Sequence, residues 1–168
     1  TLLDGVLVYP EQLTEIQGRL PLAVMFDNFV DARPQVGLEK ADLVFEVVAE
    51  GGITRFLGVF WRGEPGRIVP VRSARVYYLD WAAELSAIYV HWGWAKSSGA
   101  ADVRSAIERL GLPHFDGFFL SEPYFLRAPD RASGRTPAAV ERRLLAAARR
   151  GDPAALRRVL ERLSGPVL

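Results

Sequence analysis

Two runs of β-branched and aromatic residues separated by a glycine pair constrain the fold more than any other feature of the sequence. Leu43–Ala49 and Ile53–Trp61 both have the composition of strands, and Glu50-Gly51-Gly52 lies between them. A Gly-Gly pair between two such runs is a strong signal for a hairpin turn. The sequence therefore predicts an antiparallel β-hairpin within a larger sheet.

Four further elements are predicted in the first two thirds of the chain. Leu22–Phe26 is a continuous apolar run typical of a strand buried on both faces, and Ala87–His91 is a second such run. Helical spacing of apolar residues predicts one helix over Ser73–Leu85 and another over about Ala100–Leu110. Residues 62–71 contain two glycines and two prolines and are expected to form a loop.

The last third of the chain is expected to be helical at its end. His114–Leu120 has the composition of a short strand, and residues 121–135 are expected to be irregular. Thr136-Pro137 and Asp152-Pro153 are helix-start signals, each followed by a leucine stripe, and they predict a helical hairpin over 136–168. Residues 1–20 form a lead-in without a clear element.

These elements predict an α/β fold: a mixed β-sheet with flanking helices and a C-terminal αα-hairpin, in one domain over 1–168. With 168 residues, 49% of them hydrophobic, the chain can bury the core of one domain. A net charge of +1 argues against a nucleic-acid partner, although ten arginines between Arg127 and Arg162 face only four acidic residues. Nothing in the sequence indicates an oligomeric state.

Several classes of site are not supported by the composition. The chain has no cysteine, which excludes disulfides, thiolate chemistry and cysteine-bound zinc. His91 and His114 lack the HxxxH or HxH spacing of metal ligands, and the GxxxxGK[ST] phosphate loop is absent. No metal and no cofactor is therefore expected. No apolar run approaches the ~18 residues that a membrane span requires.

Polar residues gather where the predicted strands end. If the strands ending near Asp27 and His91 are parallel, their ends meet at one sheet edge, where open α/β sheets place ligands. The turn at Glu50–Gly52 joins that edge if the first hairpin strand runs the same way. The spacing then brings Arg72, Ser73 and Arg75 to the same edge, at the start of the predicted helix over 73–85.

Arg72-Ser73-x-Arg75 admits two interpretations. At a helix start, free N–H groups and guanidinium forks would form an anion site. Alternatively, the arginines pair internally with Asp80, Glu46 or Glu50. His91 has two interpretations as well: it is either a general base or ligand-facing group, or a core histidine bonded to a backbone carbonyl. Glu50 is a candidate base, yet strand glutamates commonly pair with arginine.

The same residues carry a family resemblance. The strings AVMFDN, GLEKADLVFE, AEGGITRF, PVRSAR and YVHWG, within roughly residues 18–127, resemble the N-terminal domain of the YerB-like family of bacterial lipoproteins. The resemblance implies an exported, envelope-associated protein attached to the membrane by a lipid anchor outside this sequence, and a second domain after this one. It implies no established reaction.

The leading hypothesis is a cell-envelope domain that binds a small polar ligand, anionic or glycan, in a cleft at the strand ends. A hydrolase or transferase acting on cell-wall material is the first alternative, with Glu50 or His91 as base. A scaffold whose basic helical hairpin docks a protein partner is the second. The expected ligand-binding residues are Asp27, Asn28, Arg33, Thr54, Arg55, Arg72, Ser73 and Arg75.

Overall fold

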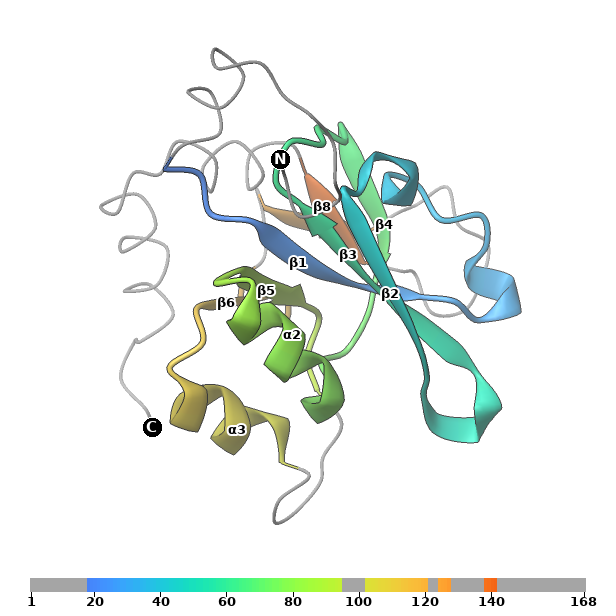
Figure 1. The fold of residues 1–168 in the computed structure, drawn as a ribbon. Coiled ribbons are helices and arrows are strands. Elements are labelled where there is room, and N and C mark those ends of the chain that lie inside the picture. The colour runs from blue at the N-terminus through green and yellow to red at the C-terminus, as the bar shows by residue number, and fades with distance from the viewer. Residues whose placement is uncertain (1–17, 95–101, 121–123, 128–137, 142–168) are drawn as a thin grey trace.

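A computed structural model describes residues 18–94, 102–120, 124–127 and 138–141, and in these residues one eight-stranded mixed sheet carries two short α-helices on one face (Figure 1). The strands are β1 Leu22–Asp27, β2 Leu43–Val48, β3 Thr54–Phe60, β4 Arg67–Val71, β5 Ile88–His91, β6 His114–Asp116, β7 Phe125–Arg127 and β8 Ala138–Glu141. The helices are α2 Leu79–Glu84 and α3 Val103–Leu110, with 3-10 turns η1 Val30–Ala32, η2 Leu38–Lys40, η3 Glu50–Gly52 and η4 Val76–Tyr78. The predicted α/β class with a mixed sheet is confirmed.

Strand β1 is a central strand of the sheet and pairs with three of the other described strands. It pairs antiparallel with β3 along its whole length, from Leu22 opposite Phe60 to Asp27 opposite Arg55. Its other flank is shared, because β5 pairs in parallel with the first half and β4 pairs antiparallel at Phe26. A strand with neighbours on both sides and packing on both faces is apolar throughout, which explains its continuous apolar sequence.

The predicted hairpin is confirmed. β2 and β3 pair antiparallel from Leu43 opposite Val59 to Val48 opposite Thr54. The connecting turn is η3, in which Gly51 and Gly52 both have positive φ, a conformation that glycine adopts without the steric cost other residues carry. The glycine pair is therefore required by the backbone of this turn.

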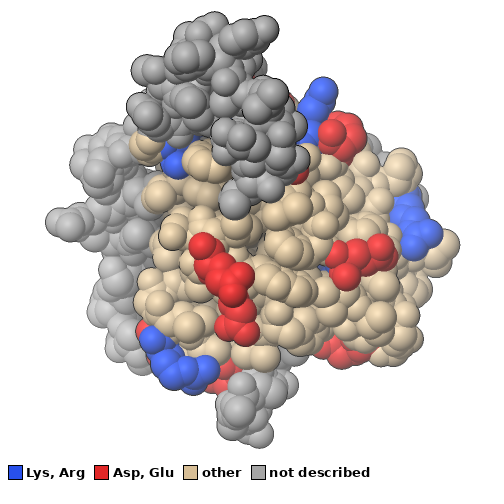
Figure 2. Space-filling view, in the orientation of Figure 1, with Lys and Arg blue, Asp and Glu red and all other residues tan. Residues whose placement is uncertain are grey.

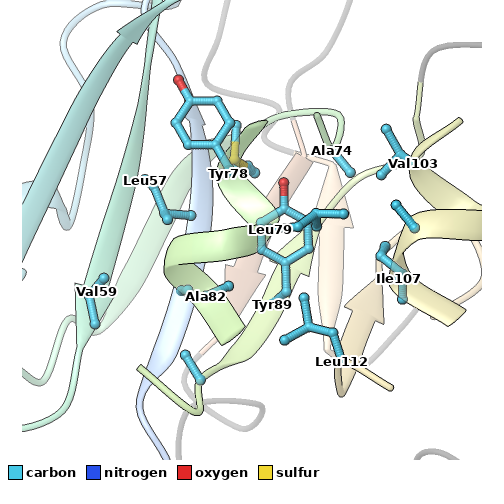
Figure 3. Close-up of a cluster of buried hydrophobic side chains, with 14 residues drawn as sticks. Leu57, Val59, Ala74, Tyr78, Leu79, Ala82, Tyr89, Val103, Ile107 and Leu112 are labelled. Atoms are coloured by element: carbon cyan, nitrogen blue, oxygen red, sulfur yellow. The ribbon is translucent and has the colours of Figure 1, made fainter. Parts of the chain in front are cut away.

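Alternate residues of the strands fill two apolar layers, one on each face of the sheet. On the helix face, Met25, Leu57 and Tyr89 pack against Leu79 of α2 and Ile107 of α3 (Figure 3). The opposite layer contains Val24, Phe26, Phe60, Ile68 and Val90. The period of two along each strand thus decides on which face a polar side chain at a strand end will lie.

The prediction of a loop over residues 62–71 was wrong for the second half of this segment, which forms β4. Pro70 and the glycines before it indicated a loop, since proline cannot donate a backbone hydrogen bond to a ladder. In β4 the pairing with β8 shifts register between Ile68 and Val71, and Pro70 stands within this irregular step. A bulge is a place where a strand tolerates proline.

The helix predicted over Ser73–Leu85 begins later than expected, with η4 at Val76 followed by α2. Arg75 still has extended backbone angles, φ −139° and ψ 142°. The preceding residues extend the sheet instead: the Arg72 amide donates to Met25 O and the Ala74 amide donates to Gly93 O. The helix predicted over Ala100–Leu110 is present as α3, capped by the Asp102 side chain.

The structure confirms the predictions for the C-terminal third of the chain only in part. β6 confirms a short strand in His114–Leu120, whereas β7 lies in a segment expected to be irregular. Ala138–Glu141, expected as the first turn of a helix, forms β8 between β4 and β7, because sheet pairing overrides a weak local helix preference. The remainder of the predicted hairpin over 136–168 lies outside the described residues.

Candidate functional site

The strand ends meet as the topology predicts. β1 and β5 are parallel, with Leu22 opposite Ile88 and Val24 opposite Val90, so both strands end at one edge of the sheet. β3 begins at this edge, where Arg55 lies opposite Asp27. The candidate residues then separate by face, because Arg55 alternates with Thr54 along β3.

Three arginines and two carboxylates gather on the helix face, and we call Arg55, Arg72 and Arg75 the arginine cluster. Glu50 at the hairpin turn accepts from Nη2 of Arg55 at 3.2 Å and from Nη2 of Arg75 at 3.1 Å. Asp27 Oδ2 lies 3.2 Å from Nε of Arg72. Together, these five side chains therefore carry one more positive than negative group.

The two arginines beside Glu50 are nearly enclosed. The side chains of Arg55 and Arg75 are 8% and 13% exposed, whereas that of Glu50 is 59% exposed. Arg55 also donates to Ser73 O at 3.3 Å and Arg75 to Ala74 O at 2.7 Å. Ser73 thus contributes its backbone carbonyl to the cluster.

The electrostatics of the cluster reflect this crowding. Burial lowers the pKa of Arg55, and the nearby cations of Arg75 and Arg72 lower it further, while Glu50 and Asp27 act in the opposite direction. The hydrogen bond from Arg75 is the main reason that the pKa of Glu50 is lowered. Glu50 is consequently ionised at neutral pH and serves as a counter-ion to two guanidinium groups.

Arg72 is the most accessible arginine of the three, with its side chain 38% exposed. Its Nε is buried and makes no hydrogen bond although Asp27 lies within ion-pair distance, so the N–H is not aimed at that carboxylate. The expected helix N-terminus is not present here, because the amides of Arg72 and Ala74 are used by the sheet. Any anion recognition at this position falls to the side chains.

The other polar residues of the edge form a separate group on the opposite face, which we call the amide network. Asn28 is buried and donates to Thr54 Oγ1 at 2.6 Å, and its own Oδ1 accepts from Arg33 Nε and Gln35 Nε2, each at 3.0 Å. Thr54 in turn donates to Glu46 at 2.6 Å. Asn28, Arg33 and Thr54 therefore belong together but do not join the arginine cluster.

Two members of these networks carry no sequence signal. Gln35 stands in an irregular loop, yet it ties Asn28 to the backbone oxygen of Asp27. Tyr78 is fully buried, and its hydroxyl donates to Arg55 O at 2.8 Å. Burial raises the pKa of Tyr78 to about 12, so this hydroxyl remains protonated.

His91 is fully buried in a group of its own. Its Nδ1 lies 3.0 Å from Gly93 O, which requires a proton on Nδ1, and its Nε2 then accepts from His114 Nδ1 at 3.1 Å. Burial is the first reason, and the His114 ring the second, that the pKa of His91 is lowered to about 3. Tyr89 lies between His91 and the arginine cluster, with its ring 5.2 Å from His91 and its hydroxyl accepting from the Arg75 amide.

Asp116 belongs to the same buried group and was not singled out from the sequence. Its Oδ1 accepts from the amides of Gly93 and Phe118, and it lies 3.8 Å from His91 Nδ1. Burial raises the pKa of Asp116. The carbonyl-bonded, neutral imidazole fits the interpretation of His91 as a core histidine.

In the described part of the chain, two further features are absent. No three histidine, aspartate, glutamate or cysteine side chains there are placed to hold a metal ion together. None of the helices described is both long and apolar enough to cross a membrane. Among the described residues on the face shown in Figure 2, acidic and basic side chains form small, separate groups and no continuous basic surface.

Comparison with known proteins identifies the family. Residues 9–152 match the family described as "Protein of unknown function (DUF3048) N-terminal domain". "Putative lipoprotein YerB" of Bacillus subtilis is 40% identical over 121 residues, which is 68% of this chain and 35% of that protein. The crystal structure of YerB from Bacillus subtilis matches with a TM-score of 0.71 and 32% identity, covering 88% of this chain and 48% of that one.

The matches establish the family of this chain and show what share of its relatives' length it covers. The chain spans about a third of the length of the relative and about half of the solved chain. The resemblance to the YerB-like lipoproteins is confirmed, over a longer part of the chain than the quoted strings indicate. This chain belongs to the DUF3048 family, whose N-terminal domain it matches.

Proposed function

We propose that this domain binds a small polar ligand that carries an anionic group, free or on a saccharide, at the arginine cluster. The observation that supports this most is the excess of cation: three guanidinium groups share two carboxylates at one sheet edge. Nearly enclosed cations are costly unless they are fully paired. A ligand anion would supply the missing negative charge.

The exposure of Arg72 defines how the ligand would approach. Arg55 and Arg75 are fixed behind it by carbonyl oxygens of the strand-to-helix connection, while Arg72 keeps a partly open side chain. Guanidinium groups bind carboxylate and phosphate through paired N–H donors, which lysine cannot reproduce.

A reaction is less well supported than binding. The hydrolase or transferase alternative requires Glu50 or His91 as base. A carboxylate paired with two arginines and with a lowered pKa is a weak base, and His91 is 0% exposed and neutral. The scaffold alternative depends on the helical hairpin predicted over 136–168, of which only Ala138–Glu141 is described, as strand β8.

We also propose an extracytoplasmic location for this domain, held at the membrane by a lipid anchor. Support comes from the relative, whose name is "Putative lipoprotein YerB". Cell-wall fragments are then candidate polar, anionic ligands of the domain.

Substitution of Arg72 tests the binding proposal. Arg72→Lys should weaken the binding of phosphate, sulfate or peptidoglycan fragments, and Arg72→Ala should weaken it further, by about tenfold or more. Added salt should lower the affinity of the wild type. Calorimetric titration measures these affinities, and Arg109→Ala, at an exposed residue of α3, controls for the lost charge.

A purely structural role of Arg72 predicts a different result. If Arg72 only neutralises Asp27, both substitutions should lower the melting temperature without any selective loss of binding. Wild-type protein that binds none of these anions would overturn the proposed function.

A further inference from the structure

The carboxylate of Glu50 occupies the face of Arg55 and Arg75 that an external anion would need. Arg75 approaches it with both Nε and Nη2, and Arg55 adds its Nη2 to the second oxygen. This is the paired arrangement by which arginine holds a bound carboxylate or phosphate. We infer that Glu50 is an internal stand-in for the ligand, and that the ligand is a carboxylate or tetrahedral oxyanion that displaces it.

This inference rests on the proposed function and adds the ligand class and a competing group. Two oxygens on one centre receive three N–H donors in the observed contact. A carboxylate, phosphate or sulfate offers the same pattern, whereas a neutral sugar hydroxyl offers a single oxygen without charge. The anionic group of the ligand is therefore what the arginines select.

The arginines are arranged to remain in place when Glu50 leaves. Arg55 is held by Ser73 O and Arg75 by Ala74 O, and both side chains are largely buried. The Tyr78 hydroxyl fixes the backbone oxygen of Arg55. A pair of guanidinium groups fixed before binding loses little side-chain freedom when an anion arrives.

Glu50, in contrast, is attached to an open turn. It opens the hairpin turn η3, and this turn projects from the sheet between β2 and β3 (Figure 1). A Cβ atom built on Gly51 or Gly52 would meet nothing within 4 Å, so the turn is free of close packing. With 59% of its side chain exposed, Glu50 covers the arginines from the solvent side.

Glu50→Gln provides the direct test, with inorganic phosphate as the probe. Glutamine keeps the size of the side chain and removes the charge that competes with phosphate. The variant should bind phosphate about tenfold more tightly than the wild type in a calorimetric titration. It should also melt at a lower temperature in phosphate-free buffer and regain the wild-type value as phosphate is added.

Glu84→Gln is the matched control, because it changes the net charge equally at an exposed residue of α2. It should bind phosphate with wild-type affinity. Equal gains in both variants would show a general charge effect and overturn the inference. If Glu50→Gln does not fold, Glu50→Asp replaces it: the shorter side chain withdraws the carboxylate from Arg75, and tighter phosphate binding than in the wild type is again expected.

The outcomes for the inference and for the proposed function differ. Phosphate binding that depends on Arg72 but is not strengthened by either Glu50 variant would overturn the stand-in role and leave the anion site intact. No phosphate, sulfate or acetate binding by wild type, Glu50→Gln or Glu50→Asp would overturn both. Phosphate binding by the wild type that becomes tighter in the Glu50 variants, and not in Glu84→Gln, supports both.

Discussion

At the scale of single residues, Asp42 organises a segment far from it in the sequence. Its Oδ2 accepts from the amides of Trp61, Arg62 and Gly63 at 2.7, 2.8 and 3.1 Å, and Oδ1 pairs with Arg62 Nε at 2.8 Å. Burial would raise the pKa of Asp42, but these amides and Arg62 outweigh it and the pKa is lowered. The chain that leaves β3 is thus held against the chain that enters β2.

Asp42→Ala should lower the free energy of unfolding by about 2–4 kcal/mol, since three amides and a guanidinium lose a charged acceptor. Because the pKa of Asp42 is lower in the fold than its unfolded value of 3.8, the ionised carboxylate stabilises the fold at pH values above 3.8. This stabilisation is lost as the pH falls through the pKa of the folded state. Urea unfolding at pH 7 and near pH 3 should therefore show a smaller difference between variant and wild type in acid. Asp31→Ala, at an exposed residue, is the control. A loss of stability below 0.5 kcal/mol at neutral pH, as for an ordinary surface substitution, would contradict this role.

At the scale of elements, β3 is shaped to receive an aromatic ring from β1. Gly58 pairs with Val24, and a Cβ atom built on it would lie 2.9 Å from Cε2 of Phe26 and 3.2 Å from the Phe60 ring. The absent side chain lets Phe26 and Phe60 approach, with ring centroids 6.2 Å apart. Glycine within a strand marks such a close approach.

Gly58→Ala should lower the free energy of unfolding by about 1–3 kcal/mol, because the added methyl overpacks this aromatic layer. Gly66→Ala is a matched control, since a Cβ atom there meets nothing within 4 Å and φ is not positive. Thermal or urea unfolding of the two variants distinguishes them. Equal stability of both would mean that the Phe26 ring moves aside at no cost.

At the scale of the whole molecule, acid stability should depend on His91. Its pKa is about 3 in the fold and 6.5 as the reference value, so the unfolded chain binds the proton first as pH falls. Stability should decrease below pH 6.5 by at most about 1.4 kcal/mol per pH unit for this one site. Unfolding measured from pH 7 to pH 4 should show a shallower slope for His91→Gln than for the wild type. An unchanged slope would show that other groups control acid unfolding.

Sequence reasoning succeeded where the signal is local. The hairpin, β1 and β5 follow from composition and glycine placement. The expectation of one polar edge depended on the condition that β1 and β5 are parallel, which the structure meets. It could not predict β4 or β8, because a strand with a proline and a strand with helix-favouring alanines are fixed by pairing with distant segments. Which face each polar residue occupies depends on register, and a shift of one residue would exchange Thr54 with Arg55. The separation of the arginine cluster from the amide network therefore required the structure.

The amide network has a consequence for the association of this molecule with others. Among the described strands, β2 ends the sheet path, and its outward side chains Val44 and Val48 are exposed on either side of Glu46. Thr54 holds Glu46 by a hydrogen bond at 2.6 Å. A charged side chain held in the middle of a terminal strand opposes the pairing of this strand with the edge strand of another sheet. We therefore expect Glu46, which completes the polar network, to disfavour edge-to-edge pairing of two copies of the domain through β2.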